Sequence, residues 1–229
     1  VRDEMRHSWQ GYVDFAWGHD ELRPISKAPR DWGGDADSGT GLGLTIFDAM
    51  TTLALMNMTK ELGACIDFVT AEVDLDKDVP ISTFEATIRM VASLLSTYEL
   101  TEEKHPALVE TATKLADRLL WAYNTSSGLF HQFVNLKTHN HWNPEFAAGA
   151  VLAELGSVQL EMRTLSYHTG NPVYDMKATH IANVLAQRCE ADGMLCPSTT
   201  VRMEDGGGRG ARVSLGALGD SYYEYLVKQ

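Results

Sequence analysis

The sequence predicts an all-α protein built from paired helices. Apolar residues recur at spacings of three and four through most of the 229 residues, which is the periodicity of one helical face. Helices with a small or acidic second face alternate with helices that have one charged face, at about 40 residues per pair. Such hairpins need neighbours to bury their faces, so they build a solenoid or an α/α barrel. The barrel is favoured because the inner helices carry acidic residues on the side that would line its lumen.

The helices follow one another with few breaks. They are expected over residues 3–17, 44–58, 60–71, 82–99, 105–123, 147–169 and 172–189, with a last helix starting near Leu218. Segment 82–99 is an inner helix with one apolar stripe and a sparsely charged second face. Segment 105–123 is a covering helix, with Glu110 and Lys114 paired one turn apart on its outer face. The long connections 124–146 and 190–213 are expected to shape the mouth of a barrel.

Charge and composition exclude several classes of function. Asp and Glu total 31 against 19 Lys and Arg, which gives a formal net charge of −12. A surface this acidic repels phosphate backbones, so we expect no nucleic-acid partner. No stretch approaches the roughly 18 apolar residues of a membrane span, and no signal peptide opens at Val1. Any membrane contact is therefore expected only through a segment absent from this chain.

Three cysteines and two glycosylation sequons bear on the compartment. Cys189 and Cys196 are near enough in sequence to form a bridge that leaves Cys65 reduced, although spacing alone does not establish the pairing. No Cys and His spacing matches a zinc site. Of the two N-x-S/T triplets, the one at Asn124 falls in an expected loop and is a better acceptor than the one at Asn57 if the protein is secreted.

Glu85 has a structural and a catalytic interpretation. The run Ser82-Thr83-Phe84-Glu85 has the pattern of a capping box, with Ser82 as N-cap. As a general acid, Glu85 would instead point into a pocket. Arg89 lies one turn further on, and a nearby cation favours the ionised carboxyl over the protonated form that a general acid needs. The residues alone leave both interpretations open.

A second acidic group opens the last predicted helix. Asp220 is placed as an N-cap residue, and Glu224 projects near it one turn later. Tyr222 and Tyr223 lie between them. Aromatic rings stack on sugar faces, and carboxylates accept paired hydrogen bonds from vicinal hydroxyl groups. The cluster therefore fits either a helix cap or a sugar-binding site.

Glu154 has no cation one turn away in its predicted helix, so it needs a partner elsewhere if it is buried. Sugar hydroxyl groups or an Arg from a neighbouring helix would serve. By contrast, His131, His139 and His141 share a loop without Asp or Glu at ligand spacing, so no metal ligand is predicted in this chain. The glycine-rich run 206–210 lacks the strand and the Lys-Ser/Thr of a phosphate loop.

Four segments, taken in order, resemble the class I α-1,2-mannosidases of glycoside hydrolase family 47. They are FAWGHDELRP at 15–24, FEATIR at 84–89, AE and SVQLE within 153–161, and DSYYEYL at 220–226. Their order and spacing agree with the family as well, and they run through essentially the whole chain. Four ordered segments are far more specific than any one of them.

The resemblance implies an (α/α)7 barrel, incomplete in this chain, with residues 1–229 as the N-terminal portion of one glycosidase domain. It implies removal of terminal α-1,2-linked mannose from high-mannose N-glycans, with inversion and with Ca2+ as cofactor. The lumen of the endoplasmic reticulum or Golgi is the expected location, or the protein is secreted. The family's third catalytic glutamate and its calcium-binding Thr are expected in the half of the domain that this chain does not cover.

The resemblance also assigns roles to residues. Glu85 falls on the general acid of the family and Asp220 on a second catalytic carboxylate. In inverting hydrolysis a water lies between acid and base, so we expect their carboxyl groups about 6.5–9.5 Å apart. Three further positions line the sugar site: Arg89, Glu154 and Glu224.

Two residues depart from the family, and the first of them, together with the incomplete barrel, keeps an alternative open. Thr51 stands where the family usually has Asp, which removes one acidic group from the lumen. Leu218 stands where the endoplasmic-reticulum enzymes carry Arg, as in the broader-specificity Golgi-type members. The alternative hypothesis is a catalytically inactive module that binds glycans or recognises glycoproteins, and a further one is a fragment that does not fold stably alone.

Overall fold

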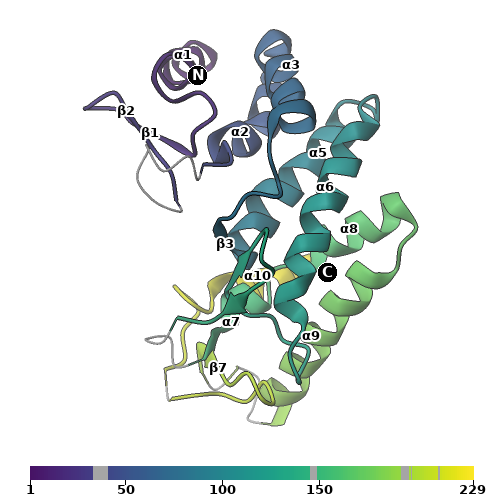
Figure 1. Cartoon of the computed structure of the whole chain (residues 1–229). Coiled ribbons are helices and arrows are strands. Elements are labelled where there is room, and N and C mark those ends of the chain that lie inside the picture. Colours follow the sequence, from purple (N-terminus) through teal and green to yellow (C-terminus); the bar gives the residue numbers. More distant parts are fainter. Residues whose placement is uncertain (33–40, 145–148, 192–195, 197, 211) are drawn as a thin grey trace. The chain divides into compact units, whose positions relative to one another are not determined.

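Figure 1 shows a computed structural model of the chain. It describes residues 1–32, 41–144, 149–191, 196, 198–210 and 212–229. These residues divide into two compact units. Unit 1 comprises Val1–Ile81, Arg89–Leu115 and Leu136–Thr138, and unit 2 comprises Ser82–Ile88, Ala116–Asn135 and His139–Gln229. Three elements run along the chain through a boundary between them: β3 (Pro80–Ser82), η3 (Ala86–Val91) and α6 (Pro106–Leu119).

Unit 1 is organised around the packing of α2 against α5. Its elements are α1 (Arg2–Ala16), β1 (Glu21–Arg23), β2 (Ala28–Arg30), α2 (Leu44–Leu55), α3 (Thr59–Asp67), η2 (Phe68–Glu72) and α5 (Ala92–Leu100). The apolar face of α2 is completely buried at Ile46, Phe47 and Leu53, and each such side chain contributes about 1.5–3 kcal/mol on burial. The Ser93 hydroxyl of α5 donates a hydrogen bond to the carbonyl oxygen of Phe47 in α2.

Gly43 sets the start of α2. Its φ is +78°, a left-handed conformation that strains residues with a side chain. A Cβ at this position would lie 2.6 Å from the Phe68 ring. Phe68 in turn meets Trp17 edge-on, with ring centroids 5.8 Å apart. A glycine is therefore required where the loop after β2 meets the aromatic cluster beside α2.

Unit 2 combines packed helices with short antiparallel strands. Its elements are α4 (Thr83–Glu85), η4 (Leu120–Tyr123), β4 (Phe133–Asn135), β5 (His141–Trp142), β6 (Ala150–Val151), α7 (Leu152–Leu155), α8 (Gln159–Thr169), α9 (Val173–Ala191), β7 (Thr200–Val201) and α10 (Asp220–Lys228). The green helices α8 and α9 lie side by side (Figure 1) and pack through buried residues such as Leu165 and Ile181. Helix α7 packs against α10. β4 pairs with β5, and β6 with β7, both antiparallel.

The helical periodicity predicts most of these elements. The predicted helix 3–17 is α1, and 172–189 is α9. The segment predicted as helix 82–99 is helical over nearly all of its length, but its turns at Ala86–Val91 are of the wider π type. The connection predicted as a loop after residue 123 carries β4 and β5, which are two or three residues long. Strands this short show too little alternation to be seen in sequence.

The prediction of one helix over 147–169 is wrong. Residues 147 and 148 lie outside the described residues, and the rest forms β6, α7 and α8 with a break at 156–158. Gly156 ends α7, and a Cβ there would lie 2.2 Å from the Tyr222 ring. Val158 then leaves the helical conformation with φ −129° and ψ −3°. The apolar stripe continues across this break, which explains why periodicity alone suggested one helix.

Two further features bear on the sequence predictions. Cys189 and Cys196 form a disulfide, and Cys65 is free and buried, which is the pairing that the sequence allowed but did not establish. Within the described ranges, the search for a helix long and apolar enough to cross a membrane finds none.

Candidate active site

Three of the predicted site residues line one hollow in unit 2. Its volume is about 330 Å³, and it is lined by Phe84, Val151, Ala153, Glu154, Leu218, Asp220, Ser221 and Glu224. Helix α7 carries Glu154, while α10 carries Asp220 and Glu224. The backbone joins the two helix starts, because the Ala153 N–H donates to the carbonyl oxygen of Leu218 at 3.0 Å.

Leu218 lies at the edge of this hollow in a strained conformation. Its φ is +73°, a region that residues with a Cβ seldom adopt. Such strain persists only where the surrounding structure enforces it, and it concentrates at functional sites. The side chain stays largely exposed, so it presents an apolar surface to whatever occupies the hollow.

Glu85 is positioned by a well-anchored helix start. Its backbone N–H donates to Ser82 Oγ at 3.2 Å, so Ser82 is the N-cap that the sequence predicts. Thr83 is tied to the segment before β4, since its N–H donates to the carbonyl oxygen of Gln132 at 2.8 Å. Its hydroxyl group donates to the carbonyl oxygen of His131 at 2.9 Å. The helix cap is thus made with the backbone N–H of Glu85. The carboxylate of Glu85 lies close enough to Glu154 to raise the pKa of that residue.

Glu154 finds its partner in Gln132. The Gln132 Nε2 donates to Glu154 Oε1 at 2.9 Å, so the partner is an amide rather than the Arg considered from the sequence. Burial raises the pKa of Glu154 to about 7, the Gln132 hydrogen bond opposes this rise, and the negative charge of Glu85 adds to it. Near neutral pH this carboxyl therefore exchanges readily between its ionised and protonated forms.

The Asp220 cluster differs from the sequence prediction in two respects. Gly219 is the N-cap, and Asp220 is the first residue of α10. Tyr222 is buried, and its hydroxyl group contacts Cys189 Sγ at 3.6 Å, so its ring belongs to the core and not to a sugar-stacking surface. Asp220 and Glu224 remain exposed on the hollow. Lys228 Nζ donates to Glu224 Oε1 at 2.5 Å.

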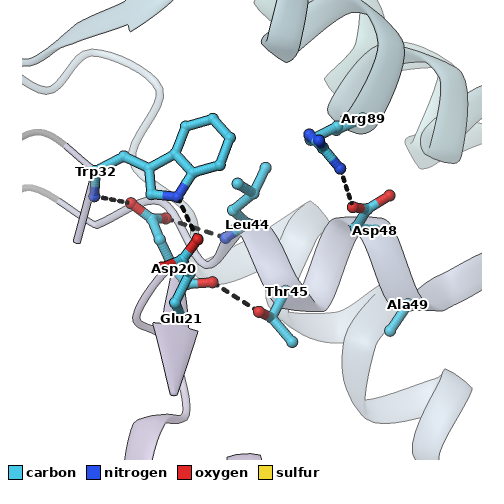
Figure 2. A pocket seen from close by; sticks show the side chains of 8 residues that line it. All are labelled: Asp20, Glu21, Trp32, Leu44, Thr45, Asp48, Ala49 and Arg89. Carbon is cyan, nitrogen blue, oxygen red and sulfur yellow. Dashed lines mark hydrogen bonds and ion pairs between the residues drawn. The ribbon is translucent and has the colours of Figure 1, made fainter. Parts of the chain in front are cut away.

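Arg89 lines a different hollow, in unit 1. Figure 2 shows it donating to Asp48 of α2, with Nη1 2.9 Å from Oδ2. Its guanidinium also lies 5.8 Å from the centre of the Trp32 ring, within the range of a cation–π contact. The hollow has a volume of about 340 Å³, and its remaining lining residues are Asp20, Glu21, Leu44, Thr45 and Ala49.

Asp20 gives the first of the four sequence segments a structural role. Its carboxylate accepts hydrogen bonds from the backbone N–H groups of Trp32, Leu42 and Leu44 at 3.0, 2.9 and 3.0 Å. Two of these bonds are visible in Figure 2. Because a carboxylate bonded to several N–H groups fixes the backbone around it, Asp20 fixes the backbone at Trp32, Leu42 and Leu44 beside this hollow.

The remaining predicted features are not among the lining residues of either hollow. Thr51 is half-buried on α2, one turn beyond Asp48, the acidic residue of α2 that meets Arg89. His131 and His141 share a hydrogen bond between their Nδ1 atoms at 2.7 Å, and burial lowers the pKa of His131. His139 stacks on Trp121 at 4.3 Å. Across the described residues, no group of three or more His, Cys, Asp or Glu could hold a metal ion.

Two partners of the predicted site residues, Gln132 for Glu154 and Asp48 for Arg89, were not predicted from the sequence. Gln132 lies in a segment expected to be a loop, and its contact with Glu154 spans 22 positions, so no local pattern marks it. Asp48 could have been found, since it lies one turn before Thr51 on the same face of its helix.

Comparisons with known proteins show which family this chain resembles. The profile of glycosyl hydrolase family 47 matches residues 4–229. A mannosyl-oligosaccharide 1,2-alpha-mannosidase of Arabidopsis thaliana is 38% identical over 230 residues, covering 100% of this chain and 39% of that protein. An endoplasmic reticulum mannosyl-oligosaccharide 1,2-alpha-mannosidase of Schizosaccharomyces pombe is 37% identical, covering 100% of this chain and 43% of that protein.

A solved structure gives the same result. The alpha-1,2-mannosidase from Trichoderma reesei matches with a TM-score of 0.85 and 27% identity, over 97% of this chain and 47% of that one. The chain thus spans less than half the length of these relatives. The predicted fold class, an all-α chain with part of an (α/α)7 barrel, is confirmed by this likeness. The chain belongs to glycosyl hydrolase family 47.

Proposed function

We propose that the protein is an exo-α-1,2-mannosidase that removes terminal mannose from high-mannose N-glycans, with residues 1–229 as the N-terminal portion of its single barrel domain. The observation that carries this proposal is the hollow of unit 2, where Glu154, Asp220 and Glu224 line one space beside the helix start of Glu85. The names of the relatives in Arabidopsis and fission yeast support the same substrate.

The proposed reaction is hydrolysis with inversion. Glu85 delivers a proton to the glycosidic oxygen as the bond from that oxygen to C1 breaks. A water molecule forms the new bond to C1 from the opposite face and loses its proton to a carboxylate base. Asp220 is the second catalytic carboxylate, and the family resemblance allows proton delivery to the leaving oxygen to pass through a water. We expect the carboxyl groups of acid and base to stand about 6.5–9.5 Å apart, leaving room for the water.

The other lining residues are proposed to bind the sugar. Glu154 and Glu224 present carboxylate oxygens, which accept hydrogen bonds from vicinal hydroxyl groups. Phe84 and Leu218 supply the apolar surface that a sugar ring's C–H face needs. Arg89 is also proposed to bind the glycan, and its guanidinium is held by Asp48 and Trp32.

Membership of the family is consistent with a calcium-dependent enzyme. The described residues offer no cluster of acidic or histidine side chains that could hold a metal ion, and the calcium-binding Thr of the family is expected outside this chain. The names of several relatives place them in the endoplasmic reticulum. We propose the lumen of the secretory pathway for this protein, where the disulfide of Cys189 and Cys196 would persist.

The test is mannose release from a high-mannose glycan by the full-length protein in the presence of calcium. Glu85→Gln and Asp220→Asn should each lower kcat by about 100-fold or more, the scale of general acid–base catalysis. Glu110→Gln, an exposed change on α6, is the matched control and should retain full activity. Release that survives both substitutions contradicts the proposal. Glycan binding without turnover by the unsubstituted protein would favour the inactive glycan-binding module instead.

A further inference from the structure

Gln132 connects three separate segments of unit 2. Its side-chain Nε2 donates to Glu154 Oε1 in α7 at 2.9 Å. Its backbone N–H donates to Asn143 Oδ1, beyond β5, at 2.7 Å. Its carbonyl oxygen accepts from the Thr83 N–H, two residues before Glu85, at 2.8 Å. The backbone of Gln132 is therefore fixed from both sides, and its side chain reaches Glu154 from a rigid base.

The direction of the side-chain bond follows from its chemistry. An ionised carboxylate only accepts hydrogen bonds, so the Gln132 amide must present its nitrogen and not its oxygen to Glu154. A hydrogen bond to a charged partner is shorter and stronger than a neutral one. The bond occupies Oε1 and fixes the plane of the carboxyl group, which determines where its other oxygen points.

We propose that Gln132 is a positioning residue for the sugar site: its side-chain amide holds the Glu154 carboxylate in the orientation that accepts hydrogen bonds from the bound mannose. This inference rests on the proposed function. Gln132 itself is not among the residues that line the hollow, so it acts through Glu154.

The electrostatics of Glu154 explain why such a residue is needed. Burial raises the pKa of Glu154 to about 7, and the negative charge of Glu85 pushes it in the same direction. The Gln132 amide is the contact that opposes both. Without it, the pKa of Glu154 would rise further, and the protonated carboxyl, which can donate, would gain over the ionised form, which only accepts. The other titratable groups are Asp220 and Glu224, which line the same hollow as Glu154, and His131, which precedes Gln132 in the chain and is hydrogen-bonded to His141.

The test compares Gln132→Met with the unsubstituted full-length protein. Methionine keeps the length of the side chain, removes the donor and leaves both backbone hydrogen bonds of residue 132 in place. Gln10→Met is the matched control, because Gln10 Nε2 donates to the Asp14 carboxylate at 2.7 Å on exposed α1. Two experiments are made. The first measures kcat and KM for mannose release from pH 4.5 to 8.5, and the second follows the titration of the 13C-labelled Glu154 carboxyl group by NMR, assigned with Glu154→Gln.

For Gln132→Met we expect Glu154 to titrate about one pH unit higher, the size of one charge-assisted hydrogen bond. KM at pH 7 should rise about tenfold with a smaller change in kcat, and the acidic limb of kcat/KM should move to higher pH. Gln10→Met should change none of these. A purely structural role would lower activity equally at every pH, and that result, or an unchanged Glu154 titration, overturns the inference.

A second variant guards against misfolding of the first. Gln132→Glu places a carboxylate against Glu154, so the pair should share a proton and Glu154 should titrate higher than in the unsubstituted protein. An unchanged titration here also overturns the inference. If the unsubstituted protein releases no mannose, the proposed function fails, and the NMR titration alone still decides whether Gln132 controls Glu154.

Discussion

Replacing Glu154 by Gln should make the protein more stable at alkaline pH while weakening its sugar site. The pKa of this carboxyl rises from its ordinary 4.5 to about 7 because of burial. Between these values the folded state binds more protons than the unfolded state. The contribution of Glu154 to the free energy of unfolding is therefore fully present below pH 4.5 and is lost as pH rises through 7. Glutamine does not ionise, so the Glu154→Gln variant does not lose this stability as pH rises.

The magnitude follows from the size of the pKa rise. At about 1.4 kcal/mol per unit, the rise from 4.5 to about 7 corresponds to about 3 kcal/mol at most. Because Glu154 is only partly buried, solvent screening reduces this to about 1–2 kcal/mol. The side-chain carbonyl oxygen that the substitution introduces can still accept from the Gln132 amide, so little of the gain is offset by a lost hydrogen bond.

The assay is chemical unfolding of the full-length protein and of Glu154→Gln at pH 4 and pH 8. The free energy of unfolding should be equal within error at pH 4 and higher by about 1–2 kcal/mol for the variant at pH 8. Glu224→Gln serves as the control, because Glu224 is exposed and paired with Lys228, and it should change stability little at either pH. A variant that is no more stable than the parent at pH 8 refutes the reasoning.

Three further substitutions test the architecture. Gly156→Ala should cost about 1–3 kcal/mol of stability, because its Cβ would meet the buried Tyr222 ring at 2.2 Å. Gly63→Ala is the control and should not destabilise the protein, because a Cβ there has no atom within 4 Å. Equal melting temperatures for the two variants would contradict this prediction. Replacing Cys189 and Cys196 by Ser should lower the free energy of unfolding by about 2–3 kcal/mol, because the disulfide closes a loop of 7 residues in the unfolded chain. A melting temperature of the unsubstituted protein that does not change when reductant is added would contradict this prediction. Arg89→Leu should lower the free energy of unfolding by at most about 1 kcal/mol, because the ion pair with Asp48 that it removes is half-exposed. It should also raise KM for the glycan, and an unchanged KM would remove Arg89 from the proposed site.

Local patterns predict the helices of this chain well, because each helix repeats its apolar spacing over several turns. Ser82 was correctly predicted as an N-cap because the cap and its partner lie three residues apart. The break at Gly156 was missed for the opposite reason. It depends on Tyr222, which is 66 positions away in the sequence and close only in the fold, so no window of neighbouring residues contains the cause.

The site residues were also predicted only in part, because some of their contacts are local and others are not. Glu154, Asp220 and Glu224 were predicted as site residues, and the structure places them on one hollow. The partner of Glu154 could not be predicted, since a Gln in a predicted loop carries no periodic signal. Arg89 was expected near the same sugar site, and the structure places it with Asp48 and Trp32 on a hollow of unit 1. Contacts between residues far apart in the sequence thus decide the partners of the predicted residues.

The stereochemistry of the first product tests the central claim most directly. Proton NMR recorded during the first minutes of hydrolysis of an α-1,2-linked mannose oligosaccharide distinguishes the two anomers before they equilibrate. The account predicts β-mannose as the first product of the full-length protein, and no early product from Glu85→Gln. Release of α-mannose first, or β-mannose formed at an unchanged rate by Glu85→Gln, would contradict it.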